Sequence, residues 1–441
     1  MRFLDWVHMN NKAKSTTLKQ VTKHDLTPRL RFPEFRDEGE WGKKKISQIS
    51  ENVTTGGTPN TLEKEYWGGS IRWMNSGELN SKKVHEVQGR ITVEGLRNSS
   101  TKTIPRKCVL IGLAGQGKTR GTVAMNMVEL CVNQSIAAIY PSDEKFYSDF
   151  LYHQLDNRYD ELRRLSAGGE GRGGLNLKII RSLDIPLPRL EEQQKIANCL
   201  SSIDELISAE AKKLDALKTH KKGLMQQLFP AEGETLPKLR FPEFREAGEW
   251  EEKTLSELGE LVSGLTYSPD DVRDNGLLVL RSSNVQNGMI VLDDNVYVRT
   301  DIKGANPSKP NDILICVRNG SKSLIGKNAV IPEGMPLCTH GAFMTVFRSK
   351  SAKFIIQLFQ TDAYDKQVSA DLGATINSIN GNHLKKYKFF VPEPDEQQKI
   401  ANGLATFDDL ITAQTQQLAA LKSHKKGLMQ QLFPNPELSS L

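Results

Sequence analysis

The residues with the clearest capacity for chemistry are GLAGQGKT, from Gly112 to Thr119, which satisfy the phosphate-binding pattern G-x-x-x-x-G-K-[ST]. In a P-loop, backbone N–H groups cradle phosphate, the lysine meets the β and γ phosphates, and the hydroxyl binds magnesium. This geometry requires a helix directly after the lysine. Arg120, Gly121, Thr122 and Val123 follow instead, and they favour a turn into another strand. We therefore expect a polar hairpin that contacts phosphate oxygens, with a nucleotide-hydrolysing P-loop as the alternative.

The chain supplies its own comparison, because it contains parts of its sequence twice. The matching segment of the second copy reads CVRNGSKS, from Cys316 to Ser323, with cysteine and serine where the pattern requires glycine. Both copies keep a lysine followed by a hydroxyl, Lys118 and Thr119 in one and Lys322 and Ser323 in the other. The second copy therefore disfavours ATP binding.

No other catalytic set is recognisable. The eight histidines are scattered, and neither HExxH nor GxSxG occurs. The five cysteines are odd in number and form no C-x-x-C pair, which predicts reduced thiols that pack as small apolar residues. We therefore expect neither an active site nor a bound metal or cofactor on this chain.

The remaining candidates are residues that read DNA. Arginine recognises guanine, and asparagine or glutamine recognises adenine, through paired hydrogen bonds in the major groove. A net charge of +6 permits nucleic-acid binding without requiring it. Polar loop residues that change identity between the copies suit readers of two different sequences, although each taken singly is more often a solvated loop residue. The candidates are Asn75, Gln116, Lys118, Arg120, Asn133 and Arg172 in the first copy, and Arg281, Asn284, Arg318, Asn319, Lys322, Lys327 and His340 in the second.

Arg172 has a specific alternative to DNA contact, and Asn133 has a counterpart in the second copy. Arg172 lies in the glycine cluster GGEGRGG, which is also typical of a flexible linker. Asn133 and Gln134 align with His340 at the next strand of each copy.

The elements that position these residues are organised by the duplication. LRFPEFRDEGEW at Leu30–Trp41 returns as LRFPEFREAGEW at Leu239–Trp250. EQQKIAN at 192–198 returns at 396–402, and HKKGLMQQLFP at 220–230 returns unchanged at 424–434. The stretches between these anchors are only faintly alike. Such a chain offers two matching surfaces to one kind of partner and two different surfaces to two targets.

Each copy ends in a predicted long helix. Apolar residues recur in steps that sum to sevens over about five heptads, which predicts a coiled coil. We expect antiparallel pairing, since the AEGETLPK connection is short; the alternative is that each helix packs on its own globular domain. Polar residues interrupt both seams and either fix the register or lie at its edge. The seams are Ile196, Leu200, Ile203, Ile207, Leu214, Leu217, Leu224 and Leu228, and Ile400, Leu404, Phe407, Ile411, Leu418, Leu421, Leu428 and Leu432, with interruptions at Glu210, Lys221, Gln414 and Lys425.

The fold class that we expect is α/β, with two mixed domains of about 140 residues that each combine short strands with one amphipathic helix. The division is a tail (1–27), a first variable domain (28–187), a helix (188–230), a linker (231–238), a second variable domain (239–391), a helix (392–434) and a tail (435–441). Expected strands include 71–74, 108–113, 122–138, 277–280, 290–298, 312–317 and 343–347, and the expected helices are 146–164 and 353–368.

The chain has no run of 18 apolar residues, so we expect no membrane span. Its opening lacks the apolar core of a signal peptide. With reduced cysteines, this composition predicts a cytoplasmic protein.

The order of variable domain and EQQKIA-led helix, occurring twice, resembles the DNA specificity subunit of type I restriction–modification systems. The resemblance covers nearly the whole chain after about residue 28. It rests on GGTP at Gly56–Pro59, on IPLPRLEEQQKIA at Ile185–Ala197, on VPEPDEQQKIA at Val391–Ala401, and on the duplication. GGTP alone is a weak signal, and the second copy replaces it with GLTYSP.

The resemblance implies a non-catalytic subunit whose two variable domains are target-recognition domains, each reading one half of a bipartite, asymmetric site in double-stranded DNA. The helices would set the gap between the half-sites. Two methyltransferase subunits that use S-adenosylmethionine would dock on the repeated segments, and two motor-nuclease subunits, which use ATP and magnesium, would join them. The predicted docking residues are Phe32, Phe35, Leu224, Leu228, Phe229, Phe241, Phe244, Leu428, Leu432 and Phe433. A third hypothesis is a coiled-coil scaffold that binds no DNA.

Overall fold

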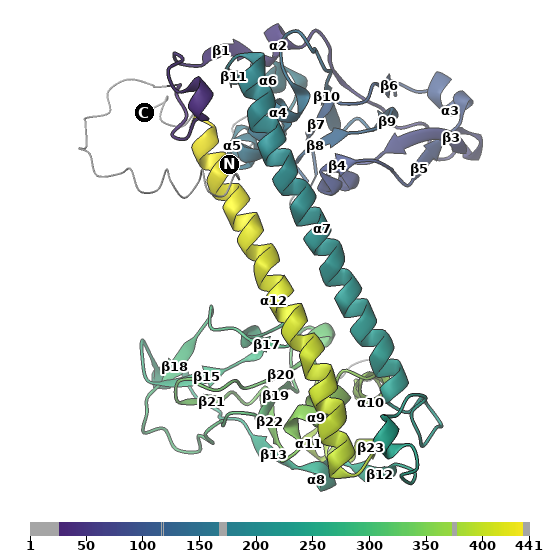
Figure 1. Ribbon diagram of the computed structural model, residues 1–441, viewed down its shortest axis with the longest axis vertical. Helices are drawn as coiled ribbons and strands as arrows, with labels where there is room; N and C mark the ends of the chain where they lie inside the picture. Colours follow the sequence, from purple (N-terminus) through teal and green to yellow (C-terminus); the bar gives the residue numbers. More distant parts are fainter. Residues whose placement is uncertain (1–25, 116, 118, 167–173, 373–376, 435–441) are drawn as a thin grey trace. The chain divides into compact units, whose positions relative to one another are not determined.

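A computed structural model describes residues 26–115, 117, 119–166, 174–372 and 377–434. Its contacts divide the chain into two compact units, Met1–Ala209 with Leu418–Leu441 (unit 1) and Glu210–Gln417 (unit 2). Each unit contains one variable part and a portion of each of the two long helices, α7 (Leu190–Leu228) and α12 (Pro394–Leu432). The labels used below are those of Figure 1.

Unit 1 contains two main sheets. One has the strand order β2-β10-β7-β8-β4 and the other β5-β3-β9-β6, while β1 and β11 form a separate pair. The strands are β1 (Gly42–Lys45), β2 (Val53–Thr55), β3 (Trp67–Met74), β4 (Lys83–Val84), β5 (Gly89–Ile91), β6 (Thr103–Ile104), β7 (Val109–Gly112), β8 (Val123–Asn126), β9 (Leu130–Val132), β10 (Ile136–Ile139) and β11 (Asp184–Leu187). The helices are α2 (Ile46–Ile49), α3 (Val93–Arg97), α4 (Ser148–Asn157), α5 (Tyr159–Leu165) and α6 (Leu177–Ser182).

Unit 2 repeats this plan with different residues. Its main sheets have the orders β13-β22-β19-β20 and β14-β18-β15-β21, with pairs β12-β23 and β16-β17 beside them. The strands are β12 (Glu251–Thr254), β13 (Glu260–Ser263), β14 (Val272–Arg273), β15 (Leu277–Leu280), β16 (Val285–Gln286), β17 (Met289–Ile290), β18 (Val296–Val298), β19 (Ile313–Cys316), β20 (Asn328–Val330), β21 (Cys338–His340), β22 (Met344–Arg348) and β23 (Lys388–Val391). The helices are α8 (Leu255–Leu258), α9 (Ala352–Leu358), α10 (Asp362–Asp371) and α11 (Gly381–Leu384). The sequence therefore predicts the mixed α/β class correctly.

The single helix expected after the strands is wrong in both units, because each has two consecutive helices. In unit 1, α4 ends at Asn157, and the next residue, Arg158, has a backbone ψ of 22° that leaves the helical range. The guanidinium of Arg158 donates to the carbonyl of Asp184 at 2.8 Å and bonds Glu161, which holds the chain at the bend. In unit 2, the interval between Phe359 and Thr361 separates α9 from α10.

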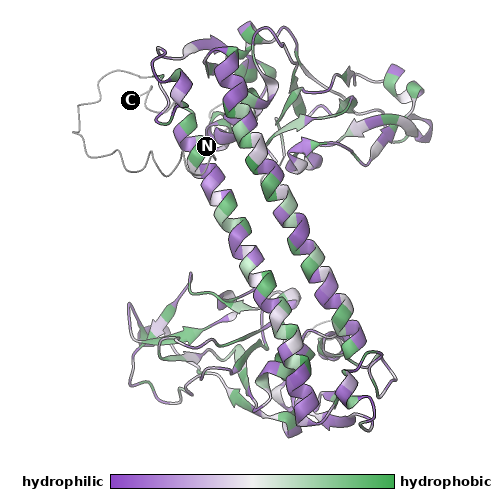
Figure 2. Cartoon of the chain, viewed as in Figure 1, coloured by the Kyte–Doolittle hydropathy of each residue, from purple (hydrophilic) through white to green (hydrophobic). Residues whose placement is uncertain are grey.

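The long helices pack antiparallel on each other, as the heptads and the short connection between the copies predict. In unit 2, Gln414 of α12 bonds Glu210 of α7, and Lys221 of α7 lies 2.6 Å from Asp408 of α12. A higher number on α7 thus pairs with a lower one on α12. Figure 2 shows apolar and polar residues alternating along both helices, as an amphipathic seam requires.

The long helices also pack on the globular parts. The two arrangements that the sequence left as alternatives, helix on helix and helix on globular domain, therefore occur together. The core of unit 1 contains Leu200 of α7 and Leu432 of α12 together with Phe150 of α4. The polar interruptions pair across the helices: Lys425 lies 2.6 Å from Asp204 in unit 1, and Lys221 reaches Asp408 in unit 2. They therefore fix the register of the seam rather than lie unpaired at its edge.

Candidate nucleic-acid interface

Each unit gathers its candidate reading loops at one edge of a pair of parallel strands. In unit 1, β3 and β9 are parallel with Met74 opposite Val132, and in unit 2, β15 and β21 are parallel with Leu280 opposite His340. Because parallel strands end at the same edge, the loops that follow them meet there. The backbone N–H of Asn133 accordingly donates to the carbonyl of Met74 at 3.1 Å.

A turn that contains glycine packs against this edge in both units. A side chain at Gly56 would lie 1.6 Å from the carbonyl oxygen of Val132, and one at Gly264 would lie 2.1 Å from that of Gly341. Glycine is therefore required where the turn crosses the strand end. GLTYSP thus keeps a glycine at a close backbone approach, although the carbonyl that it meets, that of Gly341, lies one residue after the end of β21.

The GLAGQGKT segment is a hairpin, as its flanking residues predict. Strand β7 pairs antiparallel with β8, and the N–H of Gly121 closes the turn onto the carbonyl of Gly112 at 2.8 Å. The described residues after the lysine form a turn and a strand, with no helix to complete a P-loop. Unit 2 closes its β19–β20 hairpin in the same way, from Gly326 to Cys316 at 2.8 Å.

Unit 1 brings together Asn75, Asn133 and the start of the hairpin. Asn75 is exposed but caps a short helix, accepting from the N–H of Gly77 and donating to Glu78. The side chain of Asn133 accepts from the N–H of Ser135. Arg120 is half-buried at the hairpin turn. Gln116, Lys118 and Arg172 lie outside the described residues.

Unit 2 separates the candidates into exposed and buried groups. Asn284 is fully buried and bonds the backbone of Arg281 and Val291, in the capping position that Glu78 occupies in unit 1. His340 is also fully buried, bonded to the carbonyl of Val262 at 2.9 Å, and its burial lowers its pKa. Neither side chain reaches the surface, so both leave the set of candidate DNA contacts.

The alignment of Asn133 with His340 is displaced by one residue. The strand pairing matches His340 with Val132, because both stand opposite the last residue of the parallel neighbour. Since side chains alternate between the faces of a strand, a shift of one residue exchanges a buried position for an outward one. Asn133 thus corresponds to Gly341.

The other candidates in unit 2 reach the surface: Arg318, Lys322 and Lys327 are exposed and Asn319 is half-buried on the β19–β20 hairpin, and Arg281 after β15 is half-buried. The amide of Asn319 donates to the hydroxyl of Ser282 at 2.9 Å, which joins the two loops. The guanidinium of Arg281 pairs with Asp294 at 2.8 Å and is thereby held in place. The amine of Lys322 donates to the carbonyl of Leu372 at 3.3 Å.

Phe343 belongs to this surface, although the sequence places it in a strand. Strand β22 begins one residue later, at Met344, and the Phe343 side chain is 56% exposed. The guanidinium of Arg318 lies over its ring, 5.7 Å from the centroid. Its position immediately before a buried strand gave no sign that this aromatic residue faces outward.

The repeated segments chiefly pack against one another within the chain. Arg31 bonds both carboxylate oxygens of the buried Glu192, each at 2.7 Å, and Arg240 makes the same fork with Glu396. The HKKGLMQQLFP segment of the opposite copy completes each assembly: the N–H of Leu30 donates to Gln431, and that of Leu239 donates to Gln227, both at 2.9 Å. Folding alone therefore accounts for much of the identity between the copies.

The predicted docking residues divide accordingly. Most are buried in the chain's own cores and offer little surface to a partner: Phe32, Phe35, Leu228, Phe229, Leu428, Leu432 and Phe433. Leu224, Phe241 and Phe244 are half-buried. The exposed faces of the same segments carry matching ion pairs, Glu34 with Lys195 at 3.0 Å and Glu243 with Lys399 at 2.8 Å.

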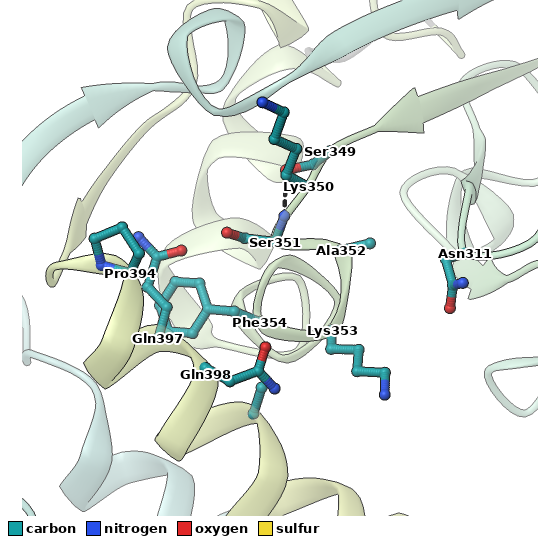
Figure 3. Close-up of a pocket in the computed structure, with 11 residues that line it drawn as sticks. Asn311, Ser349, Lys350, Ser351, Ala352, Lys353, Phe354, Pro394, Gln397 and Gln398 are labelled. Atoms are coloured by element: carbon teal, nitrogen blue, oxygen red, sulfur yellow. Dashed lines mark hydrogen bonds between the residues drawn. The ribbon is translucent and has the colours of Figure 1, made fainter.

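A pocket of about 340 Å³ in unit 2 lies beside the first turn of α12 (Figure 3). The buried Gln397 lines it, and the side-chain oxygen of this residue has no hydrogen-bond partner among the residues that the structure describes. In unit 1, the matching oxygen of Gln193 accepts from the N–H of Tyr147 at 2.9 Å, whose ring lies beside Lys107. Ser351 stands at the position of Tyr147, so the pocket marks a missing aromatic side chain.

We expect Tyr147→Ser to open the corresponding space in unit 1 and to lower its stability by about 2 kcal/mol, roughly half the cost of truncating a fully buried aromatic residue. Amide hydrogen exchange at β7 measures this loss. Ser351→Ala in unit 2 is the control and should change little, since it removes only a hydroxyl. Equal, small effects of both substitutions would contradict this account of the pocket.

The described part of the chain offers no site for metal binding or for thiol chemistry. No group of three or more His, Cys, Asp or Glu side chains there is arranged to hold a metal ion. The cysteines described are free, and burial raises the pKa of the Cys108 thiol to about 12, which suits a packing role. No helix among the described residues is both long and apolar enough to cross a membrane.

Comparison with known proteins agrees with this geometry. The family model described as "Type I restriction modification DNA specificity domain" matches residues 38–219 and 247–423. The MjaVIII specificity subunit of Methanocaldococcus jannaschii is 28% identical over 295 residues, which are 64% of this chain and 69% of that protein. The EcoKI specificity subunit of Escherichia coli (strain K12) is 30% identical over 167 residues, 36% of each chain.

Solved structures show the same fold. The S subunit of a type I restriction–modification system from M. genitalium superposes with a TM-score of 0.60 at 18% identity, covering 93% of this chain and 99% of that one. A chain from a study of complex assembly in the type I system gives a TM-score of 0.51 at 16% identity, covering 90% of this chain and 98% of that one.

Proposed function

The chain belongs to the family of type I restriction–modification DNA specificity subunits, and we propose on that premise that its two units read the unlike halves of one bipartite DNA site. The recognition domains would be residues 28–187 and 239–391. One observation carries the proposal: the same frame of loops presents different side chains in the two units. Asn75 in unit 1 corresponds to Arg281 in unit 2, and Ser135 corresponds to Phe343.

The hairpins suit contact with the DNA backbone and with bases. The sequence of each hairpin contains a lysine followed by a hydroxyl residue, groups that bind phosphate oxygens, and unit 2 presents Lys322 and Ser323 on the same hairpin as the exposed Arg318. Arg318 is the strongest base-reading candidate in unit 2, because it is exposed and is oriented by Phe343. Bidentate contact between arginine and guanine would supply discrimination between base pairs.

We further propose that the repeated segments dock two methyltransferase subunits. The matching ion pairs Glu34–Lys195 and Glu243–Lys399 give both units the same exposed surface, which identical partners require. Methyl transfer to adenine, with S-adenosylmethionine, would take place on those partners after base flipping. Two motor-nuclease subunits using ATP and magnesium would join them, and the assembly would act in the cytoplasm. This chain would supply sequence recognition and no active site.

Substitution of Arg318 tests the assignment of unit 2. We expect Arg318→Ala, assembled with methyltransferase, to relax the preference at one base pair of one half-site by about 1–3 kcal/mol and to leave the other half-site unchanged. Competition binding against duplexes that vary at each position of the site measures this effect. Lys327→Ala is the matched control on the same hairpin and should weaken all sequences about equally. A uniform loss for Arg318→Ala would mean that this residue contacts phosphate.

Two other hypotheses make different predictions. A P-loop hydrolase would consume ATP as the purified chain and lose that activity on Lys118→Ala; the β7–β8 hairpin favours the recognition function instead. A scaffold without DNA recognition would bind DNA only weakly and unselectively, with strong salt dependence, even when methyltransferase is present. Selective binding to one bipartite sequence would exclude the scaffold.

A further inference from the structure

Phe343 stands out among the candidate reading residues because it is apolar. A single exposed apolar side chain is ordinary on a protein surface, so exposure alone indicates little. Its position is more informative. The carbonyl oxygen of Phe343 accepts from the N–H groups of Val317 and Arg318, at 3.0 and 3.1 Å, which holds it against the first residues of the hairpin. The ring therefore lies within the polar loops that we assign to DNA contact.

Folding does not require an aromatic residue at this position. In unit 2, Met344 pairs with Cys316, and in unit 1, Ile136 pairs with Gly112, the residue that matches Cys316 in the hairpin. Phe343 therefore corresponds to Ser135, which makes the equivalent backbone contact: the N–H of Leu113 donates to the Ser135 carbonyl at 2.8 Å. The ring is an addition specific to unit 2.

We infer that Phe343 is a specificity-determining residue that contacts the 5-methyl group of a thymine, next to a guanine contacted by Arg318. This inference rests on the proposed function of unit 2. In the major groove the thymine methyl is the apolar feature that a phenylalanine ring recognises, while arginine binds the O6 and N7 atoms of guanine. The guanidinium carbon lies 5.7 Å from the ring centroid, less than two base-pair steps of about 3.4 Å, so the two groups reach neighbouring pairs.

Insertion of the ring between base pairs is the other use of an exposed phenylalanine on DNA. A wedge needs both faces of the ring free to lie between two bases. The guanidinium of Arg318 covers one face, and insertion would have to displace it. The geometry favours contact between the uncovered part of the ring and a methyl group.

Uracil substitution tests the inference, because uracil differs from thymine only by lacking the methyl group. The full chain, assembled with methyltransferase, is bound to duplexes in which each thymine of the site is replaced in turn. For the unaltered protein we expect one position in the half-site of unit 2 where affinity falls about five-fold. Phe343→Ser, which installs the residue of unit 1, should bind the thymine and uracil duplexes equally at that position.

Phe343→Leu is the second variant, since it keeps an apolar contact and should retain part of the sensitivity to uracil. Unchanged responses in the other half-site show that the variants are folded. The inference fails if no uracil substitution weakens binding, if the half-site of unit 2 lacks thymine on both strands, or if Phe343→Ser responds as the unaltered protein does. It also fails if 2-aminopurine fluorescence shows unstacking that depends on Phe343. If the unaltered protein and both variants all lacked sequence preference, the proposed function itself would be wrong.

Discussion

Removing one heptad from each long helix should shorten the gap between the two half-sites by about three base pairs and leave both half-site sequences unchanged. Seven residues of α-helix span about 10.5 Å, at a rise of 1.5 Å per residue, and B-DNA rises about 3.4 Å per base pair. The deletion removes 207–213 from α7 and 411–417 from α12. These segments contain Glu210 and Gln414, which occupy matching positions in the two copies and bond each other.

The design keeps the interactions that set the helix register. Lys425 with Asp204 and Lys221 with Asp408 lie outside the deleted segments, and a whole heptad preserves the apolar seam. The recognised sequence is measured by mapping methylated adenines. A two-residue deletion from each helix is the control, because it rotates the seam by about 160° and should abolish assembly. A changed half-site, or an unchanged gap with retained activity, would contradict a helical spacer.

Arg31→Ala should destabilise unit 1 by about 3–5 kcal/mol, the cost typical of removing one partner from a buried ion pair. The Glu192 side chain is fully buried, and both of its oxygens accept from Arg31. Without the guanidinium, the hydrogen bond that remains to the carboxylate from the described residues is a long one from the indole N–H of Trp41, at 3.3 Å. The carbonyls of Glu38 and Gly39 also lose their donor.

Amide hydrogen exchange at β7, which is fully buried in the same core, measures this loss. Lys43→Ala is the matched control: it breaks the ion pair with Asp184, whose two side chains are 50% and 43% exposed, and should cost less than about 1 kcal/mol. Arg31→Lys keeps the positive charge but cannot bond both carboxylate oxygens of Glu192 as the guanidinium does, so we expect an intermediate loss of stability. An effect of Arg31→Ala as small as that of Lys43→Ala would show that this pair does not hold the repeated segments together.

The features that the sequence predicts well are those with a strong local or repeated signal. Heptad spacing predicts both long helices, the short connection between the copies predicts their antiparallel pairing, and poor helix formers after Lys118 predict the hairpin. The residues of LRFPEFR were expected on a partner surface, because identity between copies does not distinguish internal packing from docking. Arg31 and Glu192 are far apart in the sequence, and no local pattern indicates that they form a buried pair.

The surface that carries the candidate reading residues was harder to predict, since burial depends on register and tertiary contacts. Asn284 and Arg281 look alike as polar residues after a strand, yet one is a buried cap and the other is at the surface. A displacement of one residue brought Asn133 opposite His340 in the alignment. Phe343 was missed because an apolar residue beside a strand is normally part of its core.

Methylome sequencing tests the central claim most directly. DNA is modified in cells that express this chain together with its methyltransferase, and every methylated adenine is mapped. Two units with different reading loops predict one bipartite motif, with two unlike half-sites separated by a fixed gap. A palindromic motif, a single continuous motif, or methylation without any sequence preference would contradict this account.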